Sequence, residues 1–437
     1  MLFELFCHGC WLLVVGYWLL VTGCWLLVIG YLSLVTGYAL LFIRHLLQNI
    51  WGCAMFSSKV HFYPYLSFSF LIKTIKYMQI TPSSRRDFIK NMSGATLAAS
   101  MPFPIPSVEK TKLGVALVGL GYYSTDVLAP AFKLAKNCYL AGIVTGSPEK
   151  AKKWQAAHKI PDKNVYNYEN FDKIANNPDI DVVYVVLPPS MHSEYVVRAA
   201  NAGKHVWCEK PMAMTVAECE AMIKTCQQNK VTLAIGYRMQ HEPNTQRIMQ
   251  YVREKSFGKT RLVSCAAGYF ETRTTHWKQK KAMGGGSMYD MGVYSLQGAR
   301  YSVGLNPKAV FAQQFTNRPE IYTEVDETMM YQLEFPNGAI ANCTTSFGMN
   351  MNYLNATCEK GWFKLDPFQA YNGIKGNSSA GLLNFPLNNQ QTRQMDDDAF
   401  AIMTKRPLLT PGEEGMQDIR VVEAIYESVK QGKRILI

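Results

Sequence analysis

Between residues 113 and 237, short apolar runs alternate with segments of helical periodicity. The runs begin at Leu113, Tyr139, Val182, His205 and Val231. Stretches such as 148–158 and 194–202 separate them, and their apolar positions recur with the spacing of an amphipathic helix. Strands that alternate with helices in this way form a parallel sheet. This part of the chain is therefore predicted to be an α/β domain.

The pattern changes after Arg261, where strand-like runs follow one another with few helical segments between them. These runs are 262–270, 309–315, 329–335 and 339–347. Alternating apolar and polar positions are typical of antiparallel strands with one buried and one open face. We therefore predict an α/β Rossmann nucleotide-binding domain at 113–237. An α+β domain with an open-faced, mainly antiparallel sheet is expected at 238–437, where it would bind substrate and form oligomers.

The first 77 residues fit neither domain. Residues 5–43 contain no Asp, Glu, Lys or Arg, and this apolar length is sufficient for a membrane span. Glycine recurs at positions 9, 16, 23, 30 and 37, within near-identical copies of seven residues. Such identity is typical of tandemly repeated DNA. We therefore favour Met78 as the true start, with a membrane anchor as the alternative.

Residues 78–104 resemble a twin-arginine export signal. Ser84-Arg-Arg-Asp-Phe-Ile-Lys90 supplies a basic region, and the small, weakly apolar residues 92–100 follow it. The alternative is a chance pair of arginines at the start of a helix. The twin-arginine machinery exports folded proteins, so the chain is expected in the periplasm with a cofactor acquired in the cytoplasm. Residues 105–112 are expected to form an extended arm before the first domain.

The net charge of +12 comes in part from the N-terminal region. From Leu113 onward, 36 basic residues face 30 acidic ones, without a basic run, so a nucleic-acid partner is not expected. Eleven cysteines are present, and the seven beyond residue 113 show no CxxC or other metal-ligand spacing. We expect them to be buried thiols, and we expect no metal site.

The first apolar run leads directly into Gly119-x-Gly121-x-x-Ser124. Glycines at this position let the backbone approach a pyrophosphate at the N-terminus of the next helix. At the end of the second run, an NAD site usually presents an acidic residue, but Thr145, Ser147 and Lys150 occur here. A hydroxyl and a lysine suit a 2′-phosphate, so NADP is favoured over NAD. The alternative is an ordinary polar turn before a helix.

Lys210 is the strongest candidate for a catalytic residue. It ends the apolar segment 205–212, and Pro211 keeps it on an extended turn, in the trans or the cis form. At the carboxyl edge of a parallel sheet such a cation reaches the ligand crevice. The alternative is a surface lysine before a proline that starts a helix. His192, after Pro188-Pro189, is expected to border the nicotinamide or to cap a helix.

A second informative segment is Gly284-Gly-Gly-Ser-Met-Tyr-Asp-Met-Gly-Val-Tyr294. A helix over about 287–301 places Asp290 and Tyr294 on one face. Near a lysine, a tyrosine can donate and accept protons, because a cation stabilises the phenolate. The alternative is a core tyrosine that is hydrogen-bonded within its own helix.

Together these motifs resemble the glucose-fructose oxidoreductase and inositol dehydrogenase (Gfo/Idh/MocA) family, from Leu113 to the end of the chain. They are Gly119-Leu-Gly-Tyr-Tyr, Cys208-Glu-Lys-Pro-Met, Gly236-Tyr-Arg, the glycine-rich segment and Thr410-Pro-Gly-Glu-Glu-Gly-Met-Gln-Asp418. Most members have histidine in place of Tyr294. Tyrosine there, together with 410–418, is similar to the periplasmic glucose-fructose oxidoreductase branch, which also carries a twin-arginine signal. The arm before Leu113 is shorter than in that branch, and the loop 271–283 matches less closely.

The resemblance implies that Lys210 polarises the reacting hydroxyl or carbonyl, that Tyr294 is the general acid and base, and that Asp290 hydrogen-bonds the substrate. A substrate contact is also implied for Arg238. In the less similar loop 271–283, we expect Trp277 and Lys278 to contact the sugar. Cofactor contacts are implied for Gly119, Gly121, Tyr122, Tyr123, Thr145, Gly146, Ser147, Lys150, Leu187, Pro188, His192, Glu209, Lys210 and Arg238.

The implied activity is hydride transfer between tightly bound NADP and a sugar, in a homo-oligomer formed through the open sheet. One alternative is an NAD-dependent glycosidase of the same family, which oxidises its substrate transiently. The other is a sugar sensor without turnover. Intact Lys210 and Tyr294 argue against the sensor.

Overall fold

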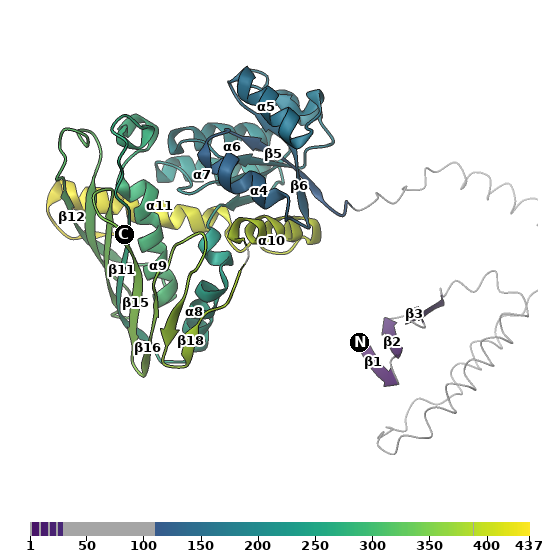
Figure 1. Cartoon of the computed structure of the whole chain (residues 1–437). Helices are drawn as coiled ribbons and strands as arrows, with labels where there is room; N and C mark the ends of the chain where they lie inside the picture. Colours follow the sequence, from purple (N-terminus) through teal and green to yellow (C-terminus); the bar gives the residue numbers. More distant parts are fainter. Residues whose placement is uncertain (1, 8–9, 16–17, 23–24, 29–109, 388) are drawn as a thin grey trace, which may run out of the picture. The chain divides into compact units, whose positions relative to one another are not determined.

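The computed structural model describes residues 2–7, 10–15, 18–22, 25–28, 110–387 and 389–437 (Figure 1). The chain divides into two compact units, 1–105 and 106–437. In the first unit, antiparallel strands pair in chain order: β1 (Leu2–Cys7), β2 (Cys10–Val15), β3 (Trp18–Thr22) and β4 (Trp25–Val28). The parts of the chain that the structure describes contain no helix long and apolar enough to cross a membrane. The twin-arginine segment 78–104 and most of the arm lie outside the described residues.

The second unit begins with a six-stranded, entirely parallel sheet in the order β10-β9-β8-β5-β6-β7. Its strands are β5 (Leu113–Val118), β6 (Cys138–Val144), β7 (Val165–Tyr166), β8 (Val182–Val185), β9 (His205–Cys208) and β10 (Leu233–Ile235). Helices α4 (Ala129–Phe132), α5 (Pro148–His158), α6 (His192–Asn201) and α7 (Val216–Gln228) connect them. Every residue of β5 and β8 is buried, because helices cover both faces of such a sheet.

The order of the strands creates a crevice. The chain passes from β5 to its neighbour β6 and later returns to β8 on the other side of β5. In open parallel sheets, ligands bind at the carboxyl ends of strands where the order reverses in this way. The loops after β5, β8 and β9 therefore lie around the expected ligand crevice.

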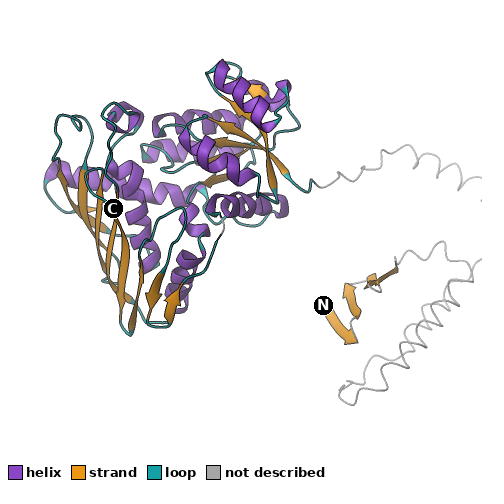
Figure 2. Ribbon diagram, in the orientation of Figure 1, coloured by secondary structure: helices purple, strands orange, loops and turns teal. Residues whose placement is uncertain are grey.

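A nine-stranded sheet follows in the order β18-β17-β16-β15-β11-β14-β13-β12-β19. Its strands are β11 (Thr260–Gly268), β12 (Ala309–Phe315), β13 (Thr328–Glu334), β14 (Ile340–Ser346), β15 (Met351–Cys358), β16 (Gly361–Leu365), β17 (Gly376–Ser378), β18 (Gly381–Leu383) and β19 (Ile435–Leu436). Only β11 and β14 pair in parallel. Figure 2 shows helices on one side of this sheet and none on the other. The predicted fold class is confirmed.

The helices of this second half are α8 (Pro243–Glu254), α9 (Val293–Val303), α10 (Gln390–Thr404) and α11 (Gly412–Gln431). Helix α10 does not pack on the large sheet. Its Met395 and Ala399 enter the core of the nucleotide-binding half beside Trp207. Residues 238–437 were expected to belong to the second domain as a whole. In the structure, α10 instead packs against the first domain (Figure 1), and α11 contacts α7 and β10 of that domain as well.

Candidate active site

The glycine loop after β5 has the geometry of an anion cradle. Gly119 has a φ of +89°, and a Cβ there would lie 2.4 Å from the backbone oxygen of Val186. A Cβ on Gly121 would meet no atom within 4 Å, so this glycine leaves open space. Ser124 donates its hydroxyl to the backbone oxygen of Gly119 at 2.6 Å, which fixes the turn. A helix starts at Tyr123, with its first N–H groups at the loop, as a pyrophosphate site requires.

The residues expected around a 2′-phosphate follow β6. Thr145 is buried, and its hydroxyl accepts from the backbone N–H of Ser147 at 3.2 Å. Ser147 caps α5 by accepting from the N–H of Lys150 at 3.3 Å. The ammonium of Lys150 donates to the backbone oxygen of Leu120 at 3.4 Å, so it lies against the glycine loop. The hydroxyls thus have local roles in the turn, and Lys150 supplies the nearby positive charge.

Lys210 and Tyr294 lie side by side, as predicted. The Lys210–Pro211 peptide bond is cis. The ammonium of Lys210 lies 4.7 Å from the centre of the Tyr294 ring and donates to the backbone oxygen of Asp290 at 2.7 Å. Burial alone would lower the pKa of Lys210, but the oxygens of Tyr294, Asp290 and Glu209 raise it above its ordinary value. The lysine therefore remains charged at neutral pH.

Asp290 bridges two ammonium groups. One carboxylate oxygen lies 3.5 Å from the Nζ of Lys210, and the other lies 2.5 Å from the Nζ of Lys278. Lys278 also donates to the hydroxyl of Tyr269 at 2.9 Å. Burial alone would raise the pKa of Asp290, but the two lysines lower it below its usual range. Lys278, predicted to bind substrate, thus holds Asp290 directly.

Arg238 lies behind Tyr294 and is almost fully buried. Its guanidinium carbon is 5.1 Å from the centre of the Tyr294 ring and 4.7 Å from that of Tyr371. It donates to the backbone oxygen of Ala370 at 3.1 Å and to the side-chain oxygen of Gln390 on α10. Arg238 therefore lies near the crevice as expected, but its guanidinium donates hydrogen bonds to other groups of the protein.

Glu209, next to the catalytic candidate Lys210, is buried beneath the crevice. It accepts from the hydroxyl of Tyr184 at 2.5 Å and from the N–H of Lys210 at 3.3 Å. Burial raises the pKa of Glu209. A Cβ on Gly236 would lie 2.7 Å from this carboxylate, so the Gly236-Tyr-Arg motif provides room for it. Glu209 supports the Lys210 turn from the protein side.

His192 connects two loops of the crevice. Its Nδ1 lies 2.9 Å from the backbone oxygen of Pro211, and its Nε2 lies 2.8 Å from that of Leu187. The ring is buried, and burial lowers its pKa. Both ring nitrogens therefore face backbone oxygens, and the residue positions Pro188 and Lys210 instead of presenting a free nitrogen to a ligand.

The remaining predicted residues lie on the rim. Tyr122 is exposed, whereas Tyr123 accepts a hydrogen bond from Gln391 on α10 at 3.3 Å. Gly146 packs against the Tyr168 ring. Trp277 is half-buried, with its ring centre 5.9 Å from the Nζ of Lys278.

Sequence reasoning missed Tyr269, Tyr371 and Gln390. Tyr269 lies near the end of the apolar run 262–270. Tyr371 lies in the irregular loop between β16 and β17, and Gln390 is the first residue of α10. None of the three belongs to a motif with a recognisable spacing.

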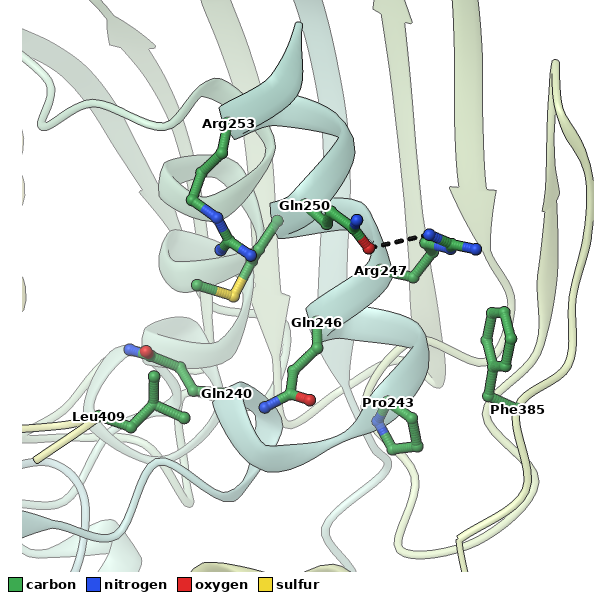
Figure 3. Close-up of a pocket in the computed structure, with 9 residues that line it drawn as sticks. Gln240, Pro243, Gln246, Arg247, Gln250, Arg253, Phe385 and Leu409 are labelled. Atoms are coloured by element: carbon green, nitrogen blue, oxygen red, sulfur yellow. Dashed lines mark hydrogen bonds between the residues drawn. The ribbon is translucent and has the colours of Figure 1, made fainter. Parts of the chain in front are cut away.

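A separate cavity of about 440 Å³ lies along α8 (Figure 3). Arg247 donates to Gln250 there at 2.8 Å. The cavity is lined by Gln240, Pro243, Gln246, Arg247, Met249, Gln250, Arg253, Phe385 and Leu409. None of these is a predicted site residue. A cavity of this kind is an ordinary candidate for a ligand site, but the titratable groups with perturbed pKa values converge beside Lys210, not here.

A glycine loop at the crevice of a parallel sheet, opposite a lysine and a tyrosine, defines a nucleotide-dependent oxidoreductase. Comparison with known families agrees. The model of the oxidoreductase family with an NAD-binding Rossmann fold (GFO/IDH/MocA) matches residues 113–237, and that of the GFO/IDH/MocA C-terminal domain matches 245–364. The chain belongs to this family, as its motifs predicted.

Several known proteins are similar along most of their length. An aldose-aldose oxidoreductase from Caulobacter crescentus, solved with glycerol, is 39% identical over 75% of this chain and all of its own, with a TM-score of 0.72. A D-xylose 1-dehydrogenase [NADP(+)] from Haloarcula marismortui is 27% identical over 72% of this chain and 90% of its own. A levoglucosan dehydrogenase solved with NADH and levoglucosan, at 20% identity and a TM-score of 0.65, shares the fold.

Proposed function

We propose that the chain is an NADP-dependent sugar oxidoreductase of the glucose-fructose oxidoreductase kind. It oxidises one sugar and reduces another while the nucleotide stays bound. The observation that carries this proposal is the convergence of the Lys210 ammonium, the Tyr294 ring and the Asp290 carboxylate at the ligand crevice. When bound there, a nicotinamide would accept and return the hydride.

The protein's own groups handle the proton. Tyr294 accepts it from the reacting hydroxyl during oxidation and returns it during reduction. The Lys210 ammonium, 4.7 Å from the centre of that ring, stabilises the negative charge that develops on the phenolic and substrate oxygens. Asp290 keeps Lys210 in place through the backbone and side-chain contacts described above. Each residue therefore acts in both half-reactions.

Lys150 supports NADP over NAD, because it brings a cation to the first turn of α5, directly after β6, where an NAD site usually presents an acidic residue to the ribose. The glycines at 119 and 121 fit the pyrophosphate of either nucleotide. Among the relatives, the xylose dehydrogenase is named for NADP.

The sugar class is supported by the names of the relatives, two of which are an aldose-aldose oxidoreductase and a xylose dehydrogenase. We propose an aldose as the hydride donor. The acceptor is a ketose, as in the glucose-fructose branch, or a second aldose. The loop that carries Trp277 and Lys278 borders Asp290 and is where we expect the two sugars to be distinguished.

An isotope experiment tests this function. The purified full chain is first denatured, and released NADP and NAD are separated by chromatography; we expect NADP. The native protein then receives ¹³C-glucose with unlabelled fructose, or with unlabelled xylose, and no added nucleotide. We expect ¹³C-gluconate together with unlabelled sorbitol in the first case, or xylitol in the second.

Two outcomes would contradict the proposal. Oxidation that requires a stoichiometric supply of free nucleotide would indicate an ordinary dehydrogenase. In a parallel reaction with a glucoside as the only sugar, release of glucose without net oxidation would indicate the redox-assisted glycosidase.

We also propose that the twin-arginine segment directs the chain to the periplasm. In a bacterial host with this pathway, wild-type protein should be found in the periplasmic fraction. Replacing Arg85 and Arg86 with lysine should retain it in the cytoplasm. Equal export of both forms would reject the proposal.

A further inference from the structure

Tyr371 is an exposed aromatic residue beside the buried reacting groups. It lies in the loop 366–375 between β16 and β17, outside the residues that the family models match. The residue is 41% exposed, whereas Tyr294 is only 7% exposed. An aromatic side chain of this size left open at a binding crevice is a candidate for ligand contact.

The position of the Tyr371 ring is fixed by its neighbours. The guanidinium of Arg238 lies against both this ring and that of Tyr294, at 4.7 Å and 5.1 Å from their centres. Arg238 in turn donates to the backbone oxygens of Ala370 and Gln369, at 3.1 Å and 3.2 Å, in the same loop. The loop therefore cannot move without disturbing a buried cation.

Two further residues, Gln390 and Tyr123, lie around Arg238 and Tyr371. Gln390 on α10 accepts from Arg238 and donates to the backbone oxygen of Ala370 at 2.8 Å. The Tyr123 ring of the glycine loop lies 6.3 Å from the ring of Tyr371, centre to centre. The exposed ring of Tyr371 thus lies near Tyr123, which follows the glycine loop, and against Arg238, which also contacts the Tyr294 ring.

We propose that Tyr371 is a substrate-contacting residue, against which the apolar C–H face of the donor sugar ring packs. This inference rests on the proposed function and names a residue that selects its substrate. A sugar ring presents apolar C–H groups on its faces and hydroxyls at its edge. A rigid aromatic ring can cover such a face at little entropic cost. The buried Arg238 holds Tyr371 so that the reacting carbon remains beside Tyr294.

Steady-state kinetics with D-glucose as donor tests the proposal. Tyr371→Ala should raise KM for glucose about tenfold while kcat stays within about threefold, because the contact binds ground state and transition state alike. Tyr371→Leu, which keeps bulk at the position but lacks the ring, should raise KM similarly. Tyr371→Phe should behave as wild type. The matched control is Tyr139→Ala, an equally exposed tyrosine at the amino end of β6, which should change nothing.

Other results would overturn the inference. An unchanged KM in both Tyr371→Ala and Tyr371→Leu would remove Tyr371 from the substrate site. Weaker retention of NADP with an unchanged KM for glucose would indicate that the Tyr371 ring contacts the nucleotide and not the sugar. If the wild-type protein turned over no aldose, the proposed function would be rejected, and this inference would be rejected with it.

Discussion

Asp290 is the residue on which the charge arrangement of the site depends. It places one carboxylate between the ammonium groups of Lys210 and Lys278, and its backbone oxygen accepts from Lys210 as well. Without it, two partly buried lysines would face each other. The neighbouring Tyr294, one helical turn away, contacts the same lysine through its ring.

Tyr294→Phe should lower turnover by about 10²- to 10⁴-fold, since the phenolic oxygen that carries the proton is removed. The binding of glucose should change little because the ring remains. Initial rates and direct sugar binding measure the two effects separately. Tyr139→Phe is the control, and turnover of Tyr294→Phe near the wild-type rate would exclude Tyr294 from proton transfer.

Asp290→Asn should destabilise the protein by about 3 kcal/mol at neutral pH, because two largely buried ammonium groups, on side chains that are only 14% and 18% exposed, lose their counter-ion. The folded pKa of Asp290 is lowered, so its contribution is present above the ordinary carboxyl pKa and is lost as pH falls toward the folded value. Denaturant unfolding should therefore give a constant deficit between about pH 6 and 8, and a smaller one in acid.

The exposed pair of Asp172 with Arg198 gives the matched control. Asp172→Asn should cost less than about 1 kcal/mol. An equal loss in both variants would show that Asp290 has no special place in the charge network.

At the scale of elements, the loops at the carboxyl ends of β5, β8 and β9 bring the site together. The glycine loop follows β5, His192 connects the loops after β8 and β9, and Lys210 stands after β9. Helix α10 adds Gln390 and Gln391, which reach Arg238 and Tyr123. A segment near the end of the chain thus completes the crevice.

The two glycines of the loop should respond differently to alanine. Gly119→Ala forces a side chain into a positive φ and against the backbone of Val186, so stability should fall by about 1–3 kcal/mol and NADP binding should be lost. Gly121→Ala meets no protein atom, so stability should be unchanged. Its affinity for NADP should nevertheless fall about tenfold or more, because the Cβ stands where the pyrophosphate approaches.

Thermal unfolding and fluorescence titration with NADPH measure these effects, and each glycine variant serves as the control for the other. Unchanged nucleotide affinity in Gly121→Ala would mean that the cofactor does not approach this loop.

The elements themselves were largely predictable. Helix α5 spans the predicted residues 148–158, and β12 spans 309–315. The helix predicted at about 287–301 is formed by a π-helical turn, Met288–Gly292, that continues directly into α9 and ends at Val303. Local periodicity and capping residues set these bounds. The packing of α10 against the first domain was not predictable, because the apolar face of α10 does not indicate which domain it will contact.

At the scale of the whole molecule, the open face of the nine-stranded sheet exposes large apolar side chains. By strand register they share one face: Leu262, Phe311, Phe315, Met330 and Trp362. Apolar patches of this kind mark association surfaces. We propose that two copies of the chain associate through this face.

Met330→Asp should therefore convert the wild-type oligomer to a smaller species in sedimentation velocity, because it buries a charge in the proposed interface. Met349→Asp, an exposed methionine in the turn after β14, is the control and should leave the mass unchanged. A wild-type chain that sediments as a monomer would reject the proposal.

The sequence by itself determined the two-domain fold, the glycine loop, Lys210 at a strand end and the pairing of Asp290 with Tyr294 on one helix face. These features follow from short-range rules of periodicity, backbone freedom and turn chemistry, which neighbouring residues carry. Only the tertiary structure decided that Lys278 holds Asp290, and that Arg238, Tyr371 and Gln390 form one group. Arg238 is separated from Tyr371 and Gln390 by more than 130 residues, and only the folded topology brings such distant side chains together.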